Sequence, residues 1–184
     1  MEGIKRQAVV LSLVESLKEH GSWCGETHIQ KSFFFLQELL KVPTNFDFIF
    51  YKHGPFSFDL RDELSIMRAN TTLEFSAKPY PYKPSYTPGA ASGKLKEVHK
   101  KSAEEFRGSI EFIAKEFSGK GVAELERLAT ALYVTLENEK CKDTAERGKL
   151  VHELKPHIAI EQAVESIKKV DDLTKRAKDE RLIH

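Results

Sequence analysis

Apolar residues recur at helical spacing near the start of the chain. Val10, Val14 and Leu17 follow i, i+4, i+7 spacing, as on one face of an amphipathic helix. Gly21 comes shortly after this pattern and can end a helix, because glycine adopts the left-handed conformation common at that position. The pattern therefore predicts a first helix over residues 4–19.

A second and more apolar helix is predicted to begin at Thr27. The run Thr27-His28-Ile29-Gln30 fits the S/T-x-x-E/Q capping box, in which the first side chain pairs with a backbone N–H of the new helix. Ile29, Phe33, Leu36 and Leu40 then keep helical spacing, and Pro43 ends the pattern. We expect this helix to lie at the centre of the core.

The next stretch predicts a strand, a sharp corner and a third helix. Residues 46–51 alternate aromatic and other side chains and favour a buried strand. Gly54 tolerates a positive φ, and Ser57 is a good N-cap for a helix over residues 58–69. This corner, which we interpret as a signature of the fold, comprises His53, Gly54, Pro55 and Ser57.

A proline-rich segment over residues 71–92 follows the third helix. Leu73-Glu74-Phe75 alternates as in a short strand, whereas the four prolines between 79 and 88 exclude a helix. The segment predicts a β-hairpin or an extended arm. A hairpin directly after a third helix is typical of a winged helix.

The second half of the chain is predicted to be helical, with helices at about 94–117, 122–138, 144–155 and 160–173. The fold class is therefore mainly α with a small β component. We expect a winged-helix-like region over residues 1–92, with its Pro/Tyr-rich arm over 71–92. A helical region over residues 93–184 is expected to pack on it as one globular unit.

Charge and cysteine content narrow the function classes. Residues 1–92 carry 10 basic and 10 acidic side chains, and residues 93–184 carry 19 and 18. This balance disfavours a protein that acts mainly on nucleic acid or an anionic membrane. Two distant cysteines, no signal-peptide pattern and no apolar run of about 20 residues predict a cytoplasmic protein without a membrane span.

Candidate catalytic and metal-binding pairs have weak patterns. Cys24 and His28 could act as thiolate and base, but nothing in the sequence activates or orients them. His152 and His157 are five residues apart, where a helical metal site favours four. No glycine-rich phosphate motif is present. We therefore expect no enzyme activity, no cofactor and no metal, and we interpret His53 as a residue that bonds within its turn.

Two surfaces are candidates for macromolecular contact. Tyr80, Tyr82 and Tyr86 on the arm are candidate contacts for a protein partner, with a wing packed on its own domain as the alternative. A winged helix that binds DNA is the second hypothesis. Its candidate contacts are Arg61, Arg68, Lys94, Lys100 and Lys101. Asp62 and Glu63 on the same third helix oppose a phosphate backbone and disfavour this second hypothesis.

Three short motifs resemble a known family. The Gln30-Lys31 pair that opens the apolar helix, the run Tyr51-Lys52-His53-Gly54-Pro55-Phe56-Ser57 and the later Leu154-Lys155-Pro156 are similar to the YwgA-type uncharacterised bacterial proteins. The likeness extends over most of residues 4–173 and, more distantly, to the Panacea domain of SocA-like antitoxins. Phe56 stands where tyrosine is common in those families.

The resemblance implies a largely helical, winged-helix-like domain that acts by direct protein contact. A toxin is one partner that it implies, as for an antitoxin or a part of a phage or mobile defence element. It supplies no catalytic residues. The sequence thus favours a non-enzymatic cytoplasmic protein that binds another protein, and it leaves a homo-oligomer open.

Overall fold

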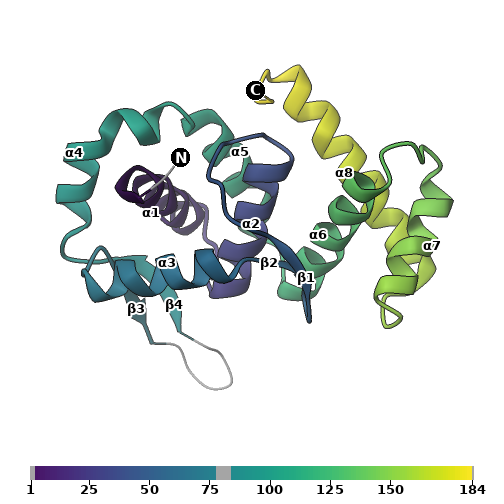
Figure 1. Cartoon of the computed structure of the whole chain (residues 1–184), viewed down its shortest axis with the longest axis horizontal. Coiled ribbons are helices and arrows are strands. Elements are labelled where there is room, and N and C mark those ends of the chain that lie inside the picture. The colour runs from purple at the N-terminus through teal and green to yellow at the C-terminus, as the bar shows by residue number, and fades with distance from the viewer. Residues whose placement is uncertain (1–2, 78–83, 184) are drawn as a thin grey trace.

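The computed structural model describes residues 3–77 and 84–183 and shows a mainly helical chain with a small β component (Figure 1). The described helices are α1 Gly3–Glu19, α2 Glu26–Glu38, α3 Phe58–Ala69, α4 Ser92–Glu104, α5 Arg107–Phe117, α6 Val122–Glu137, α7 Thr144–Leu154 and α8 Ile160–Asp179. The strands pair as two antiparallel hairpins, β1 Ile49–Tyr51 with β2 Gly54–Phe56, and β3 Leu73–Ser76 with β4 Ser85–Pro88.

The core combines residues from both halves of the chain. Helix α1 lies inside an arc made by α3, α4 and α5, and α2 packs on α5 and α6 (Figure 1). The rings of Phe35 in α2 and Phe117 in α5 meet edge to face, with their centroids 4.7 Å apart. Both rings are fully buried, and the burial of Phe35 agrees with the central position expected for the second predicted helix.

Three local predictions are wrong. Helix α2 begins at Glu26 after Gly25, and no side chain caps it, so Thr27 and Gln30 do not form a capping box. The expected buried strand shortens to Ile49–Tyr51, with Ile49 and Tyr51 exposed. The expected long helix over 94–117 divides into α4 and α5 at the buried residue Phe106, whose backbone leaves the helical conformation.

Helix α3 and the hairpin β3/β4 follow one another in the predicted order. The Ser57 hydroxyl accepts the Leu60 backbone N–H at 3.1 Å and caps α3, as expected. Residue Glu63 of α3 was expected to face water, and this expectation is wrong. It is buried and accepts hydrogen bonds from Arg6 and Gln7 of α1, so it joins the two helices.

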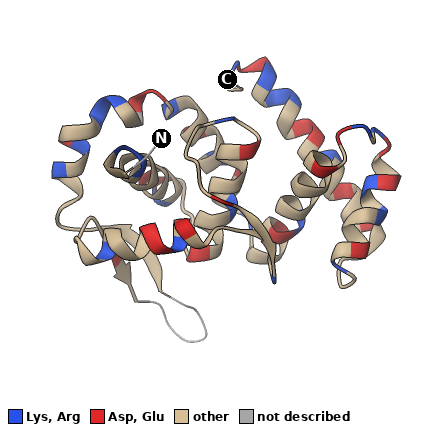
Figure 2. Ribbon diagram, viewed as in Figure 1, with Lys and Arg blue, Asp and Glu red and all other residues tan. Residues whose placement is uncertain are grey.

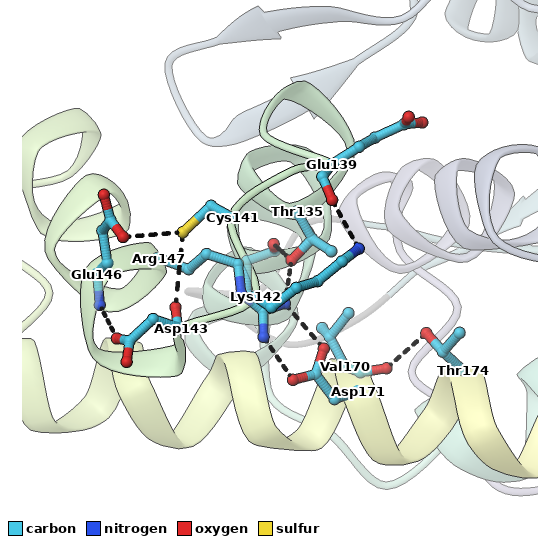
Figure 3. Close-up of polar contacts among 11 residues, drawn as sticks. Thr135, Glu139, Cys141, Lys142, Asp143, Glu146, Arg147, Val170, Asp171 and Thr174 are labelled. Carbon is cyan, nitrogen blue, oxygen red and sulfur yellow. Dashed lines mark hydrogen bonds and ion pairs between the residues drawn. The ribbon is translucent and has the colours of Figure 1, made fainter.

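A buried arginine joins the three C-terminal helices. Arg147 of α7 donates two hydrogen bonds to Asp171 of α8, at 2.8 and 2.6 Å, and one to Thr135 of α6 at 3.2 Å (Figure 3). Beside it, Gly148 lets α7 approach α8 closely. No helix in the described part of the chain has the length and apolar character needed to cross a membrane.

We predict that Gly148→Ala destabilises the fold by about 2 kcal/mol through overpacking. A Cβ atom at this position would lie 2.4 Å from a methyl carbon of Val164 and 3.2 Å from its backbone. Thermal or denaturant unfolding measures the effect. The matched control is Gly93→Ala in α4, where a Cβ meets nothing within 4 Å. A helical glycine replaced there should leave stability unchanged or raised, and equal behaviour of the two variants would contradict the prediction.

Candidate functional site

The hairpin β1/β2 brings the sequence corner onto the body of the protein. Tyr51 pairs with Gly54 across a two-residue turn at Lys52 and His53. Gly54 has a φ of +80°, and a Cβ atom there would lie 3.1 Å from the Thr130 hydroxyl of α6. The turn therefore requires glycine for its backbone conformation and for its close approach to α6. The structure thus places the sharp turn at Lys52 and His53, between two strands, with Gly54 as the first residue of the second strand.

Gln30 and Lys31 of α2 form hydrogen bonds with the backbone of β2 and of the residue that follows it. The Gln30 amide donates to the Ser57 carbonyl and accepts the Ser57 N–H, both at 2.9 Å. The Lys31 ammonium donates to the Pro55 carbonyl at 2.7 Å. Two of the three motifs that carried the family resemblance are therefore in direct contact. The Gln30 side chain, which was expected to cap its own helix, instead bonds the backbone of Ser57, 27 residues further along the chain.

A charged cluster, here called the polar centre, lies under the same hairpin and consists of Lys31, Glu126 and Lys155. All three residues are buried. The Lys155 ammonium is 3.1 Å from the Glu126 carboxylate and also donates to the Lys52 carbonyl in the turn. The third motif of the resemblance, around Lys155, thus meets the other two here.

Two exposed histidines border the polar centre. His53 in the turn and His157 after α7 approach the Glu126 carboxylate to 3.5 and 3.6 Å. The His53 side chain is 77% exposed and lies beside Glu126 of α6, whereas we had interpreted it as a residue that bonds within its own turn. In the described part of the chain, no three His, Cys, Asp or Glu side chains are grouped so that they could hold a metal ion.

Burial lowers the pKa of the Lys31 ammonium. Loss of water lowers the pKa of Lys31 to about 8, the nearby Glu126 carboxylate opposes this shift, and the Lys155 ammonium adds to it. The polar centre holds two cationic side chains against one carboxylate. Its charge is therefore only partly balanced, and the Pro55 carbonyl supplies the remaining contact to Lys31.

The outer side of the hairpin carries an exposed apolar cluster, here called the aromatic patch, formed by Ile49, Tyr51, Phe56 and Phe58. Tyr51 is 44% and Phe58 is 37% exposed. The ring centroids of Tyr51, Phe56 and Phe58 lie 5.1 to 5.9 Å from one another. The rings thus form one continuous surface where β1, β2 and the start of α3 meet.

Alternation along β1 explains this surface. Phe50 points to the opposite side, where its ring packs 4.9 Å from Tyr133 and beneath the Lys155 ammonium. Cations border the patch, with the Arg61 guanidinium 4.9 Å from the Phe58 ring centroid and the Lys52 ammonium 6.0 Å from that of Tyr51. Exposed aromatic rings bordered by arginine are typical of protein contact surfaces.

Of the three tyrosines predicted to contact a partner, only Tyr86 lies among the described residues. Tyr80 and Tyr82 lie outside the described residues. Tyr86 is buried at 6% exposure, packs 4.9 Å from Phe75 and belongs to strand β4. The expectation that Tyr86 presents an exposed ring to a partner is therefore wrong, because the hairpin β3/β4 folds back on the loop before α2 and bonds to Cys24 there.

The candidate nucleic-acid contacts are exposed but do not form one cationic face. Arg61 pairs with Asp62 at 3.0 Å, and the Arg68 guanidinium lies 3.5 Å above the Phe75 ring. Lys94, Lys100 and Lys101 lie on a different helix, α4. Figure 2 shows acidic residues interspersed with the basic ones along α3. With Glu63 turned inward, Asp59 and Asp62 are the acidic residues that α3 exposes.

The cysteine and histidine pairs have structural partners. Cys24 is buried, and burial raises the pKa of its thiol to about 12, so it is not a ready nucleophile. His28 donates to the Lys120 carbonyl at 2.9 Å, which directs it away from a role as base. His152 bonds the Ile158 carbonyl at 2.7 Å and closes the loop between α7 and α8.

Comparison with known proteins leaves the family resemblance untested. The sequence matches no protein-family model and no curated protein. The likeness to YwgA-type proteins and to the Panacea domain therefore stays a prediction. The contacts among its three motifs show what those residues do in this chain, whatever the family.

Sequence reasoning missed the polar centre and the aromatic patch. Glu126 and Lys155 follow Lys31 by 95 and 124 residues, and no short-range pattern joins them. The patch had a signal, because Ile49 and Tyr51 share one side of a strand whose other side carries Phe50. Apolar residues on both sides of a short strand were interpreted as burial, whereas one side faces solvent.

We predict that Gly54→Ala lowers the free energy of unfolding by about 1 to 2 kcal/mol, because the φ of +80° is strained for alanine. The Thr130 hydroxyl at 3.1 Å adds a close contact. Unfolding in denaturant measures this change. Gly119→Ala is the control, since its Cβ meets nothing within 4 Å and its φ is not positive. An unaltered Gly54→Ala protein would show that the turn does not depend on glycine.

A pH-dependent prediction follows from Lys31. The unfolded side chain holds its proton up to about pH 10.5, whereas the folded one releases it above about pH 8. The unfolded state therefore binds more protons between these values, and this residue makes stability rise with pH across that window. We expect wild-type stability to rise relative to Lys31→Met from pH 8 to 10.5, as measured by denaturant unfolding.

The comparison isolates one residue, because Cys24 and Tyr86, which also titrate at alkaline pH, are present in both proteins. Lys149→Met, at an exposed lysine, is the matched control and should follow the wild-type pH dependence. Parallel curves for wild type and Lys31→Met would mean that Lys31 keeps its ordinary pKa in the folded protein.

Proposed function

We propose that this chain is a non-enzymatic protein that binds another protein, and that the aromatic patch is its contact surface. The single observation that carries the proposal is the cluster of mutually packed rings at Tyr51, Phe56 and Phe58, of which Tyr51 and Phe58 are exposed and Phe56 is half-buried. Exposure of such rings to water is unfavourable in free energy, so folding alone does not explain it. Their burial against a partner would contribute favourable free energy.

The support beneath the patch favours binding with little rearrangement. Gln30, Lys31 and the Ser57 cap fix β2 and the start of α3 by direct hydrogen bonds. Ring side chains on a fixed backbone lose little conformational freedom when they are covered. The patch thus has the preorganised character of a binding surface.

The chemistry of the patch points to a partner with an apolar centre and an acidic border. Lys52 and Arg61 lie beside the rings, and the exposed His53 lies in the same turn. A partner that places carboxylates over these groups would gain from charge complementarity around the buried rings. A toxin, as the family resemblance implies, would be one protein of this kind.

We predict that Tyr51→Ala combined with Phe58→Ala lowers the affinity for the physiological partner at least about tenfold. Affinity capture from the native host followed by mass spectrometry identifies candidates, and titration of the purified candidate measures the affinity. The control is Val98→Ala with Ile160→Ala, which removes exposed apolar side chains from other surfaces. Circular dichroism verifies that both double variants fold.

Other outcomes would overturn the proposal. A partner that binds the patch variant as tightly as the wild type would place the contact surface elsewhere. Recovery of nucleic acid alone, released by nuclease or by salt, would favour the DNA-binding hypothesis and its candidate residues on α3 and α4.

A further inference from the structure

A cavity of about 550 Å³ lies apart from the aromatic patch, between the start of α2, the hairpin β3/β4 and the turn from α5 to α6. Trp23, Phe75 and Tyr86 line it with aromatic rings, and the turn over residues 118–122 contributes small residues. This volume is in the range of small-molecule sites, which are commonly lined by aromatic side chains with a few polar groups.

The hairpin forms one side of the cavity and is fixed in place. Phe75 and Tyr86 are directly paired across β3 and β4, and their rings meet at 67° with centroids 4.9 Å apart. The Tyr86 backbone N–H donates to the Cys24 carbonyl at 2.9 Å, which ties β4 to the loop that carries Trp23. The aromatic lining therefore comes from two segments that are bonded to each other.

One polar group of the lining belongs to Tyr86. The residue as a whole is 6% exposed and lines the cavity, and its backbone N–H is paired with the Cys24 carbonyl. Its hydroxyl is not sealed in the core as a buried atom without a partner, so it is available to form a hydrogen bond with a ligand group in the cavity. Burial raises the pKa of Tyr86 to about 12, so the hydroxyl is neutral and can donate as well as accept.

The other charged and polar groups of the cavity need no ionic ligand. Lys120 lies 3.6 Å from Glu124 and is already paired. Burial lowers the pKa of His28, which keeps this ring neutral while it bonds the Lys120 carbonyl. Glu26 lies in the first turn of α2, where the helix dipole favours a carboxylate. An uncharged occupant therefore fits this cavity better than an ion.

We propose that this cavity binds a small, planar, uncharged aromatic molecule with a hydroxyl or N–H group that pairs with the Tyr86 hydroxyl. Its ring packs against Trp23, Phe75 and Tyr86, where ring-to-ring contacts add to apolar burial. The cavity does not depend on the aromatic patch, so a negative result for one proposal would not contradict the other.

The test uses the fluorescence of Trp23, the single tryptophan of the chain, which reports on the cavity alone. The full chain is titrated with phenol, with anisole, which lacks the donor, and with cyclohexanol, which lacks the aromatic ring. We expect saturable binding of phenol, weaker binding of anisole and no binding of cyclohexanol. No saturable response to phenol, or equal affinities for phenol and cyclohexanol, would overturn the proposal.

Charged analogues test whether the site favours a neutral ligand. Tyramine and 4-hydroxyphenylacetate share the phenol group and carry opposite charges. Tighter binding of either one than of phenol would mean that the cavity selects an ion, and the assignment of an uncharged ligand would be wrong. Weaker binding of both supports it.

Variants locate the binding. Tyr86→Phe should lower phenol affinity about fivefold and anisole affinity by less, because phenol can donate to and accept from the Tyr86 hydroxyl, whereas anisole can only accept from it. Tyr133→Phe, a tyrosine of α6 outside the cavity lining, is the matched control and should bind as the wild type does. Phe75→Leu, at a partly exposed position that tolerates change, should weaken both aromatic probes. Unchanged phenol binding in Tyr86→Phe and Phe75→Leu would place the binding elsewhere.

Discussion

The buried Lys31 ammonium connects the two halves of this molecule, because it donates to the Pro55 carbonyl of the first half and is held beside the Glu126 carboxylate of the second. A buried ammonium is costly unless it is paired and hydrogen-bonded, and here Glu126 of α6 supplies the countercharge. Lys155 shares that carboxylate and bonds the hairpin turn. The hairpin, α2, α6 and the segment after α7 are therefore fixed by one set of contacts, and removal of any member leaves the others with buried, unpaired polar groups.

This arrangement explains why a short two-stranded hairpin can hold a surface of aromatic rings. An isolated hairpin of this length is at best marginally stable in water. The bonds from Gln30 and Lys31 replace the stability that neighbouring strands would otherwise supply. Stability is thus provided on the inner side of β1/β2, and the outer side is left free for the aromatic patch.

Local patterns in the sequence predicted the elements better than the contacts between them. Helical spacing located α1, α2 and α6, and the residue types at Gly54 and Ser57 predicted the turn and the cap, because these features depend on nearby residues alone. Gln30 shows the limit of such patterns. It fits a capping box locally, but its amide bonds the backbone of Ser57, since a buried N–H and carbonyl in a loop need partners more than an accessible helix end does. Glu126 and Tyr86 were missed or misplaced for the same reason, because their positions depend on elements distant in sequence.

The strand β1 shows how a surface that we propose to be a binding surface can be misread as core. Ile49, Phe50 and Tyr51 are all apolar or aromatic, and such a run is typical of a strand buried on both sides. In this fold only Phe50 is covered, by α6, while its two neighbours face solvent. The fold leaves 43% of Ile49 and 44% of Tyr51 exposed, so a polar residue at either position would cost the core little. Their apolar character therefore agrees with the contact that we propose with another protein.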